Sequence, residues 1–143
     1  ALGDFGDARA TTTLLDALKD KSMDVRYYSA SALAKLGDAH AVVPILTLAL
    51  KDKKQRFSEA AAQISVKFKD IAIPRLAIAL SNRKYQVRTL AANLLGAIGD
   101  NRALAHLQAS LSKEKSIRCK SAISGAIAII NRLNATPQNN LNP

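Results

Sequence analysis

The chain has 143 residues, enough for about one domain, and 48% of them are apolar while only 4% are aromatic. Strands favour β-branched and aromatic residues, so the abundance of Ala, Leu and Ile predicts closely packed helices rather than a sheet. The chain has a single cysteine, and its apolar runs are short, none longer than the one at 126–130. These features exclude an internal disulfide and a spanning helix, and we expect a cytoplasmic location. The net charge of +10 points to anionic partners.

The first seven residues, ALGDFGD, are similar to the end of a helix further along the chain, ALAKLGD at 32–38. We therefore expect the chain to be a piece of a longer protein, in which residues 1–7 close a truncated preceding repeat. The rest of the chain is expected to repeat the same design.

Each repeat is predicted to hold two helices, A and B. The A helices carry Leu at i and i+4, a spacing that places both side chains on one buried stripe. These pairs recur every 30 to 32 residues, as Leu14/Leu18, Leu46/Leu50, Leu76/Leu80 and Leu107/Leu111. The B helices begin at matching intervals, at Val25, Phe57, Val87 and Ile117. A fixed period is typical of stacked repeats, and it divides a repeat domain over 1–132 into segments 8–38, 39–70, 71–100 and 101–132. A polar, disordered tail is expected over 133–143.

Glycines and aspartates mark the predicted boundaries between repeats. Gly37 and Gly99 suit the left-handed position just past a helix end, and Asp38 and Asp100 follow as caps for the next helix. Repeat two departs from this pattern because its turn at 68–70 lacks Gly, so we expect an altered turn there.

Two prolines restrict where the A helices begin. Pro44 and Pro74 each lie two residues before the first Leu of an A-helix pair, Leu46 and Leu76 respectively. A proline fits the first turn of a helix, where no backbone N–H is missed. If either helix starts earlier, its proline would kink it.

The motif Val-Arg followed by small residues, Leu and Gly-Asp, at 25–38 and 87–100, resembles the short HEAT-like repeat of phycobilisome (bilin) lyases. Deoxyhypusine hydroxylases and many bacterial scaffold proteins share that repeat. The resemblance covers residues 1 to about 132 and implies an all-α, right-handed α-α superhelix, a HEAT-like solenoid of about four helix pairs. In such a stack the B helices line the concave face.

The resemblance does not carry an active site to this chain. Deoxyhypusine hydroxylases hold a di-iron centre with His-Glu pairs, whereas His40 and His106 precede Ala41 and Leu107. We expect capping or surface roles for these histidines, and neither a metal nor another cofactor. Because the sequence has no catalytic constellation, bilin lyase activity is implied by the resemblance alone.

The excess positive charge is concentrated in the predicted A-to-B turns and the first residues of the B helices, at 19–26, 51–56, 83–88 and 113–120. Together these four segments carry +10, so the rest of the chain is neutral. In a stack, equivalent turns fall on one edge, which predicts a basic edge able to hold an extended anion. The opposing interpretation, which stays open, is that these lysines only keep exposed turns soluble.

Many proteins with this repeat place an Asp before Val-Arg that reaches the Arg of the neighbouring repeat. Asp24 stands at that position in the first repeat, but Gln86 and Ser116 replace it later. Arg88 and Arg118 are therefore expected to be free to meet a ligand.

The predicted binding residues are cations of these turns and two tyrosines beside them: Arg26, Tyr27, Lys53, Lys54, Arg56, Arg83, Lys84, Tyr85, Arg88, Lys113, Lys115, Arg118 and Lys120. Tyr27 is expected to point outward and Tyr28 to flank the core. Cys119 lies between two cations, which predicts a lowered thiol pKa, although no catalytic partner lies near it in sequence.

The leading functional prediction is a non-catalytic scaffold module of a larger protein, holding an acidic protein segment on the basic edge and the concave face. One alternative is a bilin lyase-type subunit that handles a tetrapyrrole, and another is a nucleic-acid-binding domain. The last helix carries Ile123, Ile127, Ile129 and Ile130 over a wide arc. Self-association through that helix, or a covering neighbour, is therefore expected.

Overall fold

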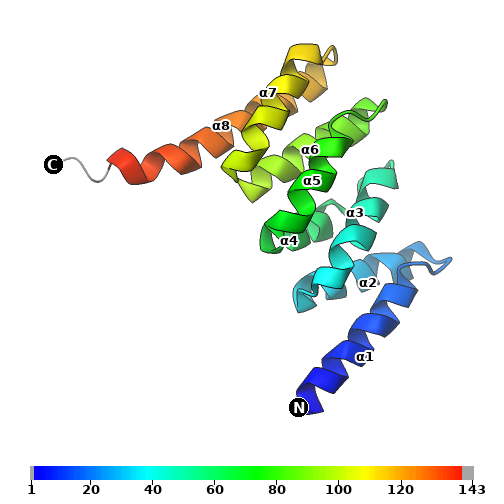
Figure 1. The fold of residues 1–143 in the computed structure, drawn as a ribbon. Helices are drawn as coiled ribbons and strands as arrows, with labels where there is room; N and C mark the ends of the chain where they lie inside the picture. Colours follow the sequence, from blue (N-terminus) through cyan, green and yellow to red (C-terminus); the bar gives the residue numbers. More distant parts are fainter. Residues whose placement is uncertain (1, 140–143) are drawn as a thin grey trace. The chain divides into compact units, whose positions relative to one another are not determined.

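The computed structural model describes residues 2–139, with side chains for residues 8–135. Over the described residues every regular element is a helix and there is no strand (Figure 1). The predicted fold class, an all-α fold built from HEAT-like helix pairs, is confirmed. The chain divides into two compact units, Ala1–Phe68 and Lys69–Pro143.

Unit 1 contains the first two helix pairs. They are formed by α1 (Leu2–Ala17), α2 (Met23–Leu36), the short 3-10 helix η1 (Ala39–Ala41), α3 (Val42–Lys51) and α4 (Ser58–Lys67). Helix α2 packs on both α1 and α4, and α3 packs on α4. Leu33, Ile45, Leu46, Phe57 and Ile64 are buried between them. The B-type helices therefore lie side by side, as expected for stacked pairs.

Unit 2 contains the third and fourth pairs. They are formed by α5 (Lys69–Ala79), α6 (Tyr85–Ile98), the 3-10 helix η2 (Asn101–Ala103), α7 (Leu104–Lys113) and α8 (Ile117–Asn139). Helix α8 packs along α6, while α5 and α7 pack on α6 and α8 respectively. The core includes Leu76, Leu95, Leu107, Ile123 and Ile130.

The Gly-Asp boundaries work as predicted. Gly37 and Gly99 end α2 and α6 in the left-handed conformation, with φ of 68° and 70°. The carboxylates of Asp38 and Asp100 then accept the backbone N–H groups of His40 and Arg102, at 2.8 and 2.9 Å. Each cap begins a 3-10 turn that leads into the next A helix.

Both ends of the repeat domain differ from the prediction. Helix α1 is continuous from Leu2 and does not break at Gly6-Asp7, because a glycine inside a helix costs only about 1 kcal/mol relative to Ala. Helix α8 continues past 132 to Asn139. Leu133 lies against Gly99, which gives the extra turn a packing partner. The expected tail is therefore helical to 139, and residues 140–143 lie outside the described residues.

The turn without glycine, at 68–70, is the altered turn that the sequence predicted. Phe68 alone separates α4 from α5, with φ of −119° and ψ of 60°. Since α5 begins at Lys69, Pro74 lies inside that helix. The prediction that Pro74 lies in the first turn is therefore wrong. Pro44 does lie in the first turn of α3. The boundary between the two units falls at this same turn.

The apolar arc of α8 is only partly buried. Ile123 and Ile130 are fully buried in the core, whereas Ile129 and Leu133 remain 41% and 56% exposed. A bilayer-crossing helix must be both long and apolar, and none in the described part of the chain combines the two.

Candidate anion-binding turns and the groove between α5 and α7

Two of the predicted ligand-binding arginines hold the A-to-B turns in place. Arg26 donates its Nη1 hydrogens to the backbone carbonyls of Asp20 and Lys21, at 2.6 and 3.2 Å. Arg88 binds the equivalent carbonyls of its own turn, at 2.8 and 2.9 Å. The arginine of the Val-Arg motif therefore satisfies carbonyls of the turn itself, beyond the end of the preceding helix.

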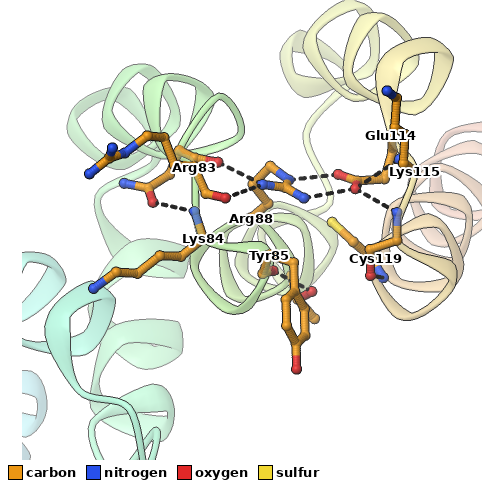
Figure 2. Close-up of polar contacts among 10 residues, drawn as sticks. Arg83, Lys84, Tyr85, Arg88, Glu114, Lys115 and Cys119 are labelled. Atoms are coloured by element: carbon orange, nitrogen blue, oxygen red, sulfur yellow. Dashed lines mark hydrogen bonds and ion pairs between the residues drawn. The ribbon is translucent and has the colours of Figure 1, made fainter.

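Arg88 also forms an ion pair with the following repeat. Its Nε and Nη2 donate to the two carboxylate oxygens of Glu114, at 2.7 and 2.9 Å (Figure 2). The side chains of Arg88 and Glu114 are only 20% and 2% exposed. The prediction that Arg88 is free to meet a ligand is therefore wrong. The acidic partner that the sequence pattern lacked is a glutamate 26 residues after Arg88.

Glu114 links this ion pair to the start of α8. Its carboxylate also accepts the backbone N–H groups of Lys115 and Ser116, at 3.1 and 3.0 Å. The hydrogen bonds from Arg88 are the largest cause that lowers the pKa of Glu114 to about 2. The carboxylate is thus anionic and fully engaged near neutral pH.

The second turn uses its arginine within one loop. Arg56 lies two places earlier than the Val-Arg pattern expects, and its guanidinium binds the carboxylate of Asp52 at 2.8 and 3.2 Å. Asp52 also accepts the backbone N–H of Arg56 at 2.7 Å, and these hydrogen bonds help to lower its pKa to about 2. Gln55 in between takes a positive φ of 54°. Arg56 therefore stabilises its own turn through these hydrogen bonds.

The other predicted cations are exposed. Their side chains make no hydrogen bond or ion pair with any residue that the structure describes: Lys53, Lys54, Arg83, Lys84, Lys113, Lys115, Arg118 and Lys120. Figure 2 shows the side chains of Arg83, Lys84 and Lys115 extending away from the Arg88–Glu114 pair. We call these eight residues the free turn cations. A single edge that joins all four turns involves both units and stays a prediction.

The tyrosines differ from the prediction. Tyr28 is 69% exposed and Tyr27 only 39%, so the residue expected to flank the core is the more exposed one. Their rings meet edge to face, with centroids 5.5 Å apart. Tyr85, also 39% exposed, begins α6, and its ring points away from the Arg88–Glu114 pair (Figure 2).

Cys119 is buried, and the prediction of a lowered thiol pKa is wrong. Burial is the largest cause that raises the pKa of Cys119, while its neighbours Arg118 and Lys120 are exposed and lie on the solvent side of α8. The exposed His40 places its ring Nδ1 2.8 Å from the carboxylate of Asp38. Among the described residues, no three His, Cys, Asp or Glu side chains gather as a metal site would require.

A groove runs between α5 and α7 within unit 2, and the sequence reasoning did not find it. One part has a volume of about 590 Å³ and reaches Lys113 at the A-to-B turns. The other has about 650 Å³ and reaches Arg102 at the opposite end. Ala77, Ser81 and His106 line both parts, so the two parts adjoin. The signal in the sequence was a small residue on each of the two facing helices, Ala77 on α5 and Ala109 on α7.

Acidification is expected to destabilise unit 2 through Glu114. Its pKa is about 2 in the folded chain, against about 4.3 for an ordinary glutamate, so its stabilising contribution is complete above about pH 5 and is lost as the carboxyl is protonated towards pH 2. In Glu114→Gln the free energy of unfolding should depend less steeply on pH over this range. Urea denaturation at a series of pH values, followed by far-UV circular dichroism, measures both slopes. Equal slopes would contradict this role of Glu114.

Comparison with protein families gives two matches along the chain. Residues 1–67 match the model for HEAT repeats, and residues 87–113 match the model for the PBS lyase HEAT-like repeat. Together the two models cover more than half of the chain. A comparison with curated proteins gave no match.

Proposed function

Since this chain belongs to the HEAT-like repeat proteins, which stack helix pairs into scaffold modules, we propose that it is a non-catalytic binding module for an acidic protein segment. The free turn cations would hold that segment, together with the exposed face of the B helices. A larger protein would contain the module.

The observation that carries this proposal is how the charges of the turns are paired. Asp52 and Glu114, the acidic residues just after α3 and α7, are already bound by Arg56 and Arg88. The lysines around them are left without a carboxylate. Like charges that lie close together repel one another, so a bound anion would stabilise the turns. A protein segment is favoured because HEAT-like stacks present extended surfaces that suit a chain rather than a small ion.

A charge-reversal experiment tests the proposal. The 143-residue chain is titrated with two fluorescein-labelled probes, a deca-glutamate peptide and a single-stranded oligo-dT of equal length, at low and at physiological salt. In the triple variant Lys54→Glu, Lys84→Glu, Arg118→Glu, the affinity for deca-glutamate should fall at least about tenfold at low salt, because each change replaces attraction with repulsion. Arg88 is left intact because it supports the fold.

A matched triple variant controls for net charge. Arg9→Glu, Lys69→Glu and Arg75→Glu reverse three exposed cations of the A helices α1 and α5, outside the A-to-B turns and the B helices. Equal losses in both triple variants would show that only total charge matters and would contradict the proposal. Tighter binding of oligo-dT at physiological salt would favour the nucleic-acid alternative. Binding of neither probe would leave the turn lysines as solubilising residues.

The bilin lyase-type alternative has a separate test. Mixing the chain with a free bilin and recording the visible spectrum measures tetrapyrrole binding directly. A spectral shift that saturates with protein concentration would support that alternative, and an unchanged spectrum would count against it.

A further inference from the structure

The groove between α5 and α7 has the shape of a short, open trough. Its α5 wall carries Pro74 and Ala77 and ends at Ser81 in the turn after α5, and its α7 wall carries His106 and Ala109. Residues at these spacings lie on one helix face, so the two walls face each other along their length. The A helices therefore do not close over this part of unit 2.

The length of the trough matches a peptide of about five residues. From Asp70 to the end of α5 at Ala79 the wall rises roughly 14 Å at 1.5 Å per helical residue, and it continues past Ser81 in the following turn. An extended chain advances about 3.3 Å per residue, so about five residues would fill that distance. This is the length of a short linear segment rather than of a folded domain.

The middle of the trough suits one apolar side chain. Ala77, which lines both parts, and Ala109 are small and leave space there, and Ile78, which lines the part toward Arg102, is 76% exposed. An exposed isoleucine next to a hollow gives an incoming aliphatic side chain apolar surface to cover.

The two ends of the trough differ in charge. At the A-to-B end, the lining side chains of Arg83, Lys113 and Lys115 have no partner among the described residues, and Arg88 neutralises the carboxylate of Glu114. This end therefore carries unneutralised positive charge.

At the opposite end the charges are satisfied. Arg102 binds Asp70 at 2.7 Å and Asp100 at 2.9 Å. With Lys69, whose charge also acts on Asp100, the two carboxylates at this end are balanced by two cations, so this end has no excess positive charge to offer an acidic group.

We infer that the α5–α7 trough binds a short acidic segment of a partner protein, with one aliphatic side chain over Ala77 and Ala109 and the acidic residues beside Lys113 and Lys115. This inference rests on the proposed function and assigns the partner's chemistry, its direction and its place on unit 2. Charge complementarity at one end and the apolar middle carry it. The contacts lie on the A helices, not on the face of the B helices.

The test uses a pair of labelled peptides and the full 143-residue chain. The first peptide is Gly-Ser-Leu-Gly-Glu-Glu-Glu-Glu, which places a leucine two residues before the acidic run, and its twin carries Ser in place of Leu. The Leu peptide should bind about tenfold more tightly than its twin, because it buries an aliphatic side chain. On binding, the amide NMR signals of Ala77, Ser81 and Ala109 should shift.

A matched pair of variants on one helix locates the site. Ala109 and Ala105 are both exposed on α7, but only Ala109 lines the trough. Ala109→Glu should weaken the Leu peptide at least about tenfold, whereas Ala105→Glu, with the same change of charge, should change its affinity less than about threefold. Both variants should keep the helical circular dichroism of the parent chain.

The outcomes separate this inference from the proposed function. Equal binding of the two peptides, with equal effects of the two alanine variants, would overturn the trough. If the Lys54, Lys84 and Arg118 triple variant still loses deca-glutamate binding in that case, the proposed function stands. If, in addition, the triple variant binds deca-glutamate as tightly as the parent chain does, both the trough and the proposed function are overturned. If oligo-dT shifts the same amide signals at lower concentrations than the Leu peptide does, the ligand of the trough is a nucleic acid and not an acidic peptide.

Discussion

Replacing Arg88 with Ala is expected to lower the free energy of unfolding by about 3 kcal/mol, since removing one member of a buried ion pair leaves the other charge unpaired. The carboxylate of Glu114, only 2% exposed, would lose both guanidinium hydrogen bonds. The carbonyls of Asn82 and Arg83 would lose their donor at the same time. A single side chain thus connects the turn after α5 to the turn after α7.

The neighbouring Arg83 provides the control. It lies in the same turn, but its side chain is exposed and has no partner among the described residues, so Arg83→Ala should change stability by less than about 0.5 kcal/mol. Urea denaturation followed by far-UV circular dichroism measures both, and a double-mutant cycle with Glu114→Ala isolates the pair. A cost for Arg88→Ala no larger than that for Arg83→Ala would show that the ion pair does not support the fold.

The second large effect is expected at a close contact between α6 and α8. Gly96 is buried in α6, and a Cβ at this position would lie 3.1 Å from both Cα and Cβ of Ala126. A leucine there must push the two helices apart, since one of the opposing atoms belongs to the backbone. Gly96→Leu should therefore lower the free energy of unfolding by about 3 kcal/mol.

Gly125 is the matched position for that prediction. It also lies inside a helix, α8, but no atom comes within 4 Å of its added Cβ. Gly125→Leu should raise stability by up to about 1 kcal/mol, because leucine forms helix better than glycine does. Thermal unfolding of the two variants under one condition compares them. Similar melting temperatures would mean that helix propensity, and not the contact between α6 and α8, decides the outcome at Gly96.

The arginines of the turns show how a charge count and a binding surface differ. Arg26, Arg56 and Arg88 contribute to the basic excess in the sequence, yet each is engaged by its own turn or by the next repeat. A guanidinium offers five donors in a planar fork, which suits it to bridging carbonyls and carboxylates. The turn lysines carry the same charge on a compact ammonium group, and Lys53, Lys54, Lys84, Lys113, Lys115 and Lys120 pair with none of the described residues.

Several local features could be predicted from the sequence. The repeat period followed from the recurrence of the Leu pairs in the A helices. Two residues four apart share one helix face, so each pair marks the buried stripe of one repeat. The left-handed ends of α2 and α6 followed from Gly37 and Gly99, since few other residues accept a positive φ. The exposure of Arg118 also agreed with its lack of a neighbouring acid.

Other features could not be predicted because they depend on distances between repeats. Arg88 looked free in sequence since its partner, Glu114, belongs to the next turn. Cys119 looked activated by adjacent cations, but a helix turns successive side chains by about 100°, and this one faces the core. The order of exposure of Tyr27 and Tyr28 was likewise set by packing.

The sequence by itself determined that this protein is a repeat of helix pairs, where its glycine-capped helices end, and that its charge is concentrated in the A-to-B turns. These features depend on residues within one or two helical turns, where spacing and backbone preference are sufficient. The tertiary structure alone decided which cations are engaged, why Gly96 must stay small, and that a trough lies between α5 and α7. Each of these depends on how closely two helices approach, and that distance is set by the packing of the whole unit.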